Sequence, residues 1–188
     1  MTAGTAPADL AAMAREIMDR IRYLVLGTVD EDGRPRTSPV YFVPHGYQDL
    51  YWVSDPASHH SHNLGRDGRL SGVVFDSTVP PGPDGRAVYV TGTAREVRPD
   101  ELAEHLLHAF DPGRGARAFT AEELTGDTDL RLWVMHVDNW EVHLPAGHPT
   151  LGTGTDRRVP VDPGKLSPDG PRPPRSSVSD ARNQKERA

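Results

Sequence analysis

Apolar residues along the chain follow two periods, and each period predicts its own kind of element. A spacing of three or four positions predicts an amphipathic helix over residues 8–21, carried by Leu10, Met13, Ile17 and Ile21. Similar spacing predicts a helix that opens at Pro99 and Asp100 and ends near Phe110. Shorter helices are expected over residues 56–66 and 120–124.

Runs rich in β-branched and aromatic residues, separated by turn residues, predict the strands. We expect them over residues 23–30, 35–43, 50–54, 69–77, 86–97 and 130–144. Pro39 predicts an edge or an irregularity in its strand, because proline cannot donate to a ladder. Gly92 predicts a bulge or the close approach of another backbone. Many short antiparallel strands with hairpin turns indicate a small barrel.

The strand pattern ends near residue 155, and the composition then changes. Residues 156–188 contain six prolines, no aromatic residue, and eight Lys or Arg against five Asp or Glu. Such a segment cannot bury enough apolar surface to offset the entropy of ordering it. We therefore expect one folded domain over residues 1–155 and a disordered Pro/Arg-rich C-terminal tail over residues 156–188. A basic interaction tail is the alternative.

Composition excludes several classes of function. The formal net charge of −6 argues against a nucleic-acid binder, and the absence of cysteine rules out disulfides, thiolate metal sites and thiol nucleophiles. No apolar run is long enough to span a membrane, and the N-terminus lacks the pattern of a signal peptide. The sequence therefore predicts a cytoplasmic protein with neither nucleic acid nor membrane as a partner.

Three segments carry a resemblance to a known family: GTVDEDGRPRTSPVYF, LYWVSDPASHHSHNLGRDGRLSGVVFD and AVYVTGTAREV. Their order and spacing resemble the FMN-binding split barrels of the pyridoxamine 5'-phosphate oxidase superfamily. The resemblance implies a mainly β fold, a Greek-key antiparallel split barrel with flanking helices. It also implies a homodimer with two flavins at its interface, and a flavin-dependent oxidoreductase that acts on a small-molecule substrate.

The resemblance places the FMN beside the segment Arg36-Thr37-Ser38-Pro39-Val40. Its first residue matches the family's phosphate-facing arginine, and its later residues would run along the ring. The planar guanidinium of Arg36 suits a phosphate because it can form two parallel hydrogen bonds. Alternation directs Arg36, Ser38 and Val40 to one face of the strand. Without the resemblance, a solvated arginine beside a hairpin turn is the simpler interpretation.

A second part of the resemblance is Val53-Ser54 followed by Ser58-His59-His60. Here a strand ends in a hydroxyl group, and a helix opens whose free N–H groups would face the phosphate. Relatives often carry Arg or Lys where this chain has the histidine pair. A histidine beside a phosphate dianion tends to be protonated, so we expect flavin affinity to fall at high pH.

Two further residues are candidate cofactor contacts. Asn63 either caps the helix or touches the cofactor. Trp140 either lies near the flavin of the partner subunit or is a core or dimer-interface aromatic. No catalytic acid or base stands out, and hydride transfer to a flavin does not require one.

Other kinds of site find little support. His59, His60 and His62 fall short of the converging ligands that zinc needs, and we expect no metal. No HExxH, GxGxxG, P-loop or GxSxG motif is present. The family's Arg-x-His substrate segment is replaced by one that begins at Glu141, so vitamin B6 oxidation is not expected. The alternatives are a reduced-deazaflavin-dependent oxidoreductase and a non-catalytic flavin- or haem-binding protein.

Overall fold

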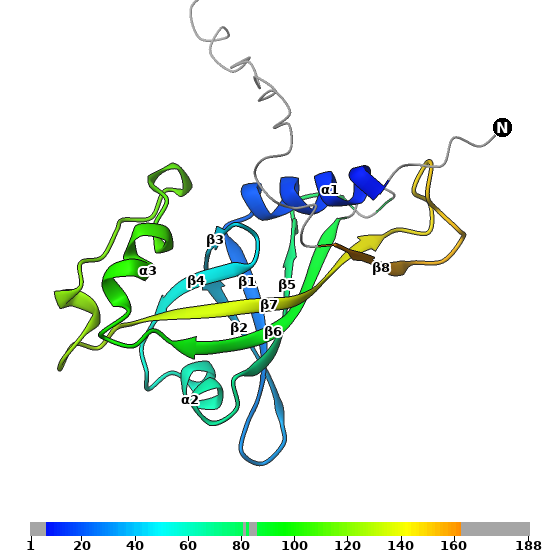
Figure 1. The fold of residues 1–188 in the computed structure, drawn as a ribbon. Coiled ribbons are helices and arrows are strands. Elements are labelled where there is room, and N and C mark those ends of the chain that lie inside the picture. The colour runs from blue at the N-terminus through cyan, green and yellow to red at the C-terminus, as the bar shows by residue number, and fades with distance from the viewer. Residues whose placement is uncertain (1–6, 81, 83–85, 163–188) are drawn as a thin grey trace, which may run out of the picture.

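The computed structural model describes residues 7–80, 82 and 86–162, which form one antiparallel sheet with three α-helices around it (Figure 1). In chain order the elements are α1 (Pro7–Arg20), β1 (Tyr23–Val29), β2 (Pro35–Tyr41), β3 (Val43–His45), β4 (Asp49–Ser54), α2 (His59–Arg66), β5 (Arg69–Phe75), β6 (Ala87–Glu96), α3 (Leu102–Ala109), β7 (Arg131–Leu144) and β8 (Arg157–Val161). None of the described helices is long and apolar enough to cross a membrane.

The strands run in the order β2-β1-β5-β6-β7-β4-β3, and β8 pairs with the C-terminal half of β7. The sheet curves into a half-barrel, which confirms the expected mainly β split barrel with flanking helices. In Figure 1, α1 lies at one end of this half-barrel and α2 at the other. Both helices contribute side chains to the same core, so they close its two ends.

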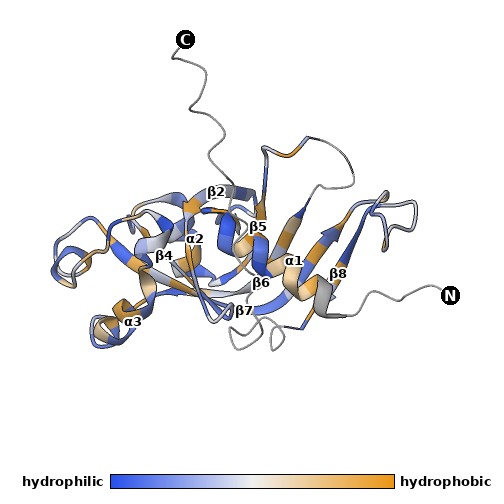
Figure 2. Ribbon diagram, turned by 90° about the horizontal axis from the view of Figure 1, so that it is seen from above, coloured by the Kyte–Doolittle hydropathy of each residue, from blue (hydrophilic) through white to orange (hydrophobic). Residues whose placement is uncertain are grey.

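Two hydrophobic cores lie on opposite faces of the central strands β4 and β7. The larger core fills the half-barrel and includes Trp52 stacked on Trp133, with ring centroids 6.4 Å apart. The smaller core lies under α3 and takes the intervening positions, such as Tyr51 and Val134. Strands β1 and β5, farther from α3, are buried mainly on one face, so buried and less buried positions alternate along them. The strands of the sheet carry both hydrophobic and hydrophilic residues (Figure 2).

Both irregular positions expected from the sequence have a structural reason. Pro39 lies in β2, opposite Val25, and β2 is an edge strand of the described sheet, where proline is tolerated. At Gly92 the register between β6 and β7 shifts. A Cβ at Gly92 would lie 2.0 Å from the carbonyl oxygen of His136, so only glycine allows this close approach. Both expectations are confirmed.

Two strands were not expected. β3 begins at Val43, the last residue of the predicted strand 35–43, and continues to His45, between the two predicted strands; it pairs with β4. β8 forms where the disordered tail was expected, so the folded part extends beyond residue 155. The side chain of Val161 packs into the larger core, and the Arg158 guanidinium lies 3.6 Å from the ring centroid of Tyr89. These contacts stabilise a strand that its own composition disfavours. The rest of the expected tail, residues 163–188, lies outside the described residues.

Candidate functional site

The N-terminus of α2 gathers several of the predicted phosphate contacts. Ser58 caps the helix: its backbone is extended, and its Oγ accepts a hydrogen bond from the N–H of Ser61 at 3.4 Å. Ser54, the last residue of β4, places its Oγ 2.8 Å from His60 Nε2 and 3.2 Å from Ser58 Oγ. The first backbone N–H groups of a helix have no intrahelical acceptors, so this end of α2 presents donors to an anion.

A second group of side chains ties α2 to the β1–β2 hairpin. Asn63 is 4% exposed, and its Nδ2 donates to Thr28 Oγ1 at 3.1 Å and to Asp30 Oδ1 at 2.9 Å. The other carboxylate oxygen of Asp30 accepts a hydrogen bond from Arg36 Nε at 2.6 Å. The side chain of Asn63 therefore does not cap α2. It positions Asp30, and through Asp30 it positions Arg36.

The predicted strand segment in β2 turns different residues to its two faces. The register places Arg36, Ser38 and Val40 opposite buried residues of β1, as the alternation predicted. Burial increases along this row, from the exposed Arg36 through the half-buried Ser38 to Val40, which is 7% exposed and belongs to the core. Thr37 and Pro39 are exposed on the opposite face. A ligand held by Arg36 would therefore lie at the open end of this strand.

The other predicted contacts differ in how they are buried. His59 is exposed in the first turn of α2. Val53 is partly buried and packs against the smaller core. Trp140 is 1% exposed and packs in the larger core, which is one of the two interpretations that the sequence left open.

The charges of the site follow from these contacts. Hydrogen bonds from Arg36 and then Asn63 lower the pKa of the Asp30 carboxyl, and the nearby His59 adds a smaller effect in the same direction. The same hydrogen bond to Asp30 raises the pKa of Arg36. Burial lowers the pKa of His60 below its ordinary value. At neutral pH the group therefore holds one cation, one carboxylate and a neutral imidazole at His60.

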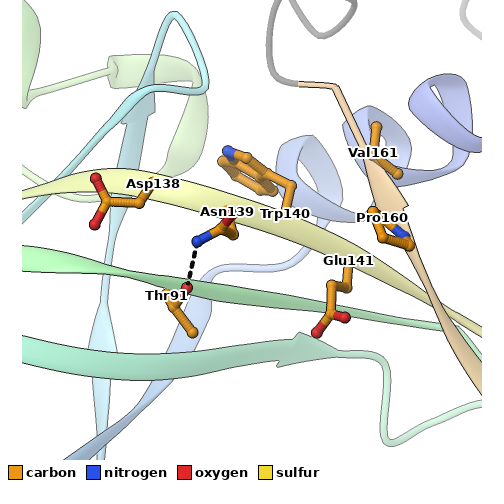
Figure 3. A pocket seen from close by; sticks show the side chains of 7 residues that line it. All are labelled: Thr91, Asp138, Asn139, Trp140, Glu141, Pro160 and Val161. Atoms are coloured by element: carbon orange, nitrogen blue, oxygen red, sulfur yellow. Dashed lines mark hydrogen bonds between the residues drawn. The ribbon is translucent and has the colours of Figure 1, made fainter.

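A separate hollow of about 340 Å³ is lined by residues of β6, β7 and β8 (Figure 3). Its lining consists of Thr91, Asp138, Asn139, Trp140, Glu141, Pro160 and Val161. Asn139 Nδ2 donates to Thr91 Oγ1 at 3.2 Å, and the two acidic residues are the lining's charged groups. A lining with two carboxylates does not suit a phosphate. Within residues 7–80, 82 and 86–162, no group of three His, Asp or Glu side chains could hold a metal ion.

Sequence reasoning missed Asp30, Thr28 and Ser61. Asp30 follows β1 directly and precedes a glycine turn, so it has the composition of an ordinary turn residue. Thr28 pairs with Arg36 across the hairpin, and Asp30 lies two residues after Thr28. This spacing could have indicated an ion pair between Asp30 and Arg36. Ser61 lies three residues after Ser58, the spacing at which an N-cap contacts its helix.

Comparisons with known proteins agree with this fold. The family model described as pyridoxamine 5'-phosphate oxidase matches residues 10–144. A comparison with curated proteins finds no match. Among solved structures, a heme binding protein from Mycobacterium smegmatis is 20% identical with a TM-score of 0.60, and the alignment covers 88% of this chain and 61% of that one.

Two further solved structures are similar. A Clostridium acetobutylicum protein related to general stress protein 26, of the pyridoxinephosphate oxidase family, is 11% identical with a TM-score of 0.59, covering 82% of this chain and 96% of that one. A conserved hypothetical protein from Mycobacterium tuberculosis is 17% identical with a TM-score of 0.55, covering 80% and 93%. Identities this low show a shared fold alone, whereas the family model matches most of the chain. The chain therefore belongs to the pyridoxamine 5'-phosphate oxidase family.

Proposed function

We propose that this chain is a cytoplasmic flavin-dependent oxidoreductase that holds FMN, or a related deazaflavin coenzyme, by its phosphate at the N-terminus of α2. The observation that supports this most is the set of donors at that helix end. Ser54, Ser58 and His60 are hydrogen-bonded to one another there, and Arg36 is tied to the same helix through Asp30 and Asn63.

The chemistry of this donor set fits a phosphate group. Hydroxyl, imidazole and backbone N–H groups can each donate to a phosphate oxygen, and Arg36 adds a guanidinium whose terminal nitrogens are not the atoms bonded to Asp30. The Arg36 side chain is 47% exposed, so a ligand can reach it. The Asp30 carboxylate beside Arg36, in contrast, opposes an anion at this position.

Within this proposal the chain binds and orients, while the coenzyme accepts the hydride or electrons. Arg36 and the first turn of α2 hold the phosphate. The family resemblance supports a flavin ring that runs along the backbone of β2 after Arg36. No acid or base of the site has an assigned catalytic role, and the substrate is an unidentified small molecule.

The second copy of the homodimer is proposed to dock on an outer apolar face, formed by Tyr23, Val25, Val73, Phe75 and Tyr89 on β1, β5 and β6. Val25 pairs with Val73, and Val73 with Tyr89, so these residues lie side by side. Tyr23 is 59% exposed and Phe75 is 45% exposed. Large contiguous apolar side chains left in solvent mark an interaction surface.

A Phe75→Arg variant is expected to weaken dimerisation at least about tenfold, because a buried interface position would then carry an unpaired charge. Sedimentation velocity over a concentration series measures the change. Leu107→Arg is the matched control: Leu107 is 76% exposed but lies on α3, outside the outer apolar face. A monomeric wild-type protein, or equal effects of the two variants, would contradict the proposed interface.

Flavin-phosphate affinity is expected to decrease as the pH rises from about 6 to about 9. Burial holds the pKa of His60 below its ordinary value in the free protein, and a phosphate beside it would raise that pKa. Binding then takes up a proton, so affinity is highest at low pH and falls through the window between the free and bound pKa values. A His60→Asn variant should lose this part of the pH dependence in a fluorescence titration. Identical pH profiles for the two proteins would show that His60 does not face the phosphate.

The coenzyme itself can be identified from the purified protein. Mass spectrometry of the small molecules released on denaturation is expected to find FMN. If the protein is purified without a ligand, reduced deazaflavin is added and its fluorescence followed. Release of haem instead, or failure to bind either flavin, would refute the proposed function.

A further inference from the structure

The phosphate-facing arginine of this site already has an anionic partner of its own. Asp30 accepts the hydrogen bond of Arg36 Nε at 2.6 Å, and the Asp30 side chain is only 17% exposed. The carboxylate cannot readily swing away, because Asn63, which is 4% exposed, donates to its other oxygen at 2.9 Å. The positive charge of Arg36 is therefore partly neutralised before any ligand arrives.

The other charged groups near the site do not restore a positive balance. On the hairpin, Arg34 pairs with Asp32 at 3.3 Å. On α2 and just after it, Arg66 donates to the carbonyl of Val29, and Arg69 pairs with Asp67 at 2.7 Å. On the segment before α2, the carboxylate of Asp55 accepts from the N–H of Ala57. The remaining donors around Ser58 are uncharged in the free protein: hydroxyl groups, backbone N–H groups and the His60 imidazole, whose pKa is lowered by burial. The imidazoles of His59 and His60, in the first turn of α2, are the groups that can gain a proton when an anion binds there.

We propose that Asp30 sets the charge of the ligand that this site accepts, so that it prefers a phosphate with a single negative charge, as in a phosphodiester, over a dianionic phosphomonoester. This inference rests on the proposed function, because it concerns the same phosphate position. Each negative charge of the ligand is attracted by the Arg36 guanidinium and repelled by the Asp30 carboxylate. The second charge of a monoester therefore adds little attraction while it still loses its hydration.

Asn63 is the positioning residue of this arrangement. Asn63 lies on α2, and its side-chain amide donates to the Asp30 carboxylate. This hydrogen bond holds Asp30 at a fixed distance from the N-terminus of α2, where the phosphate would bind. FMN can still bind, either with its phosphate singly protonated or at reduced affinity as the dianion. A coenzyme whose phosphate is esterified twice meets no such cost.

Three ligands with the same ring test the inference: riboflavin, riboflavin 4',5'-cyclic phosphate and FMN. They carry no phosphate charge, one charge and two charges at about pH 8, which lies above the second phosphate pKa of about 6. Affinities are measured by fluorescence titration for the wild-type protein and for Asp30→Asn. Asp32→Asn is the matched control, since Asp32 lies on the same hairpin and pairs with Arg34 instead of Arg36.

The wild-type protein is expected to bind the cyclic diester at least as tightly as FMN, and both more tightly than riboflavin. In the Asp30→Asn variant, the ratio of FMN affinity to diester affinity is expected to increase about tenfold. The reason is that Asp30 repels each negative charge of a ligand, and FMN carries one more charge than the diester. Riboflavin affinity should stay unchanged in both variants, which also checks that they are folded. Asp32→Asn should leave the ratio of FMN to diester affinity as it is.

A wild-type protein that binds FMN more tightly than the diester would overturn the inference but leave the proposed function standing. So would an Asp30→Asn variant with an unchanged ratio. If none of the three ligands bound, the inference would fail, and the proposed function would fail with it if reduced deazaflavin did not bind either. The ratio of FMN affinity to diester affinity in the wild-type protein tests the inference even if the Asp30→Asn variant does not fold.

Discussion

The double variant Arg36→Ala with His60→Ala is expected to bind FMN at least about 100-fold more weakly than the wild-type protein. Arg36 is the cation of the site, and a charge-assisted hydrogen bond to phosphate is among the stronger polar interactions in proteins. Its removal also leaves the Asp30 carboxylate without its ion pair and facing the incoming phosphate. His60 adds the imidazole that bonds Ser54 at 2.8 Å, so the double variant also frees that hydroxyl.

Quenching of flavin fluorescence during titration measures this loss, and riboflavin separates phosphate binding from ring binding. The double variant should keep the riboflavin affinity of the wild-type protein, because riboflavin has no phosphate to lose. Arg34→Ala is the matched control on the same hairpin: its side chain is 78% exposed and pairs with Asp32. Undiminished FMN affinity in the double variant would mean that the phosphate lies elsewhere.

Arg114→Ala is expected to lower the free energy of unfolding by about 3 kcal/mol, the largest stability effect that we predict for a single side chain. Arg114 is 7% exposed and reaches the C-terminal end of α1. Its guanidinium donates to the carbonyl oxygens of Met18 at 3.0 Å, Asp19 at 3.1 Å and Ile21 at 2.7 Å. These carbonyls lie at the end of the helix, where intrahelical donors run out, so the variant leaves them without this partner.

The same guanidinium lies 5.0 Å from the ring centroid of Phe42, which adds a cation–π contact in the interior. Thermal unfolding should show a fall in Tm of about 10 °C. Arg117→Ala, at an exposed arginine that pairs with Glu123, should cost less than about 1 kcal/mol. A similar loss in both variants, or a loss below about 1 kcal/mol for Arg114→Ala, would show that the guanidinium does not hold the end of α1.

The elements that could be predicted from the sequence are those whose stability comes from their own pattern. The helical spacing of α1 and the runs of β-branched and aromatic residues in β1, β5 and β6 are local signals, and each predicted the right element. β3 and β8 are different, because they are short and depend on pairing with β4 and β7. A strand of this kind carries too few apolar residues to be recognised before its partner is known.

The residues of the candidate site also fall into those that the sequence predicted and those that it did not. Arg36, Ser54, Ser58 and His60 were predicted through the family resemblance, and the structure ties them to one helix end by hydrogen bonds. Asp30 was missed because its partner Asn63 is 33 positions away in the chain, and no local pattern indicates such a contact. Its effect on charge therefore follows only from the fold, although the ion pair with Arg36 lies within one hairpin.

A crystal structure of the protein with its flavin coenzyme tests the central claim most directly. We predict phosphate oxygens within about 3 Å of the Arg36 guanidinium, the Ser58 hydroxyl and the first backbone N–H groups of α2. Asp30 should remain on the Nε side of Arg36. A phosphate bound elsewhere, such as in the hollow between Thr91 and Pro160, would contradict the account.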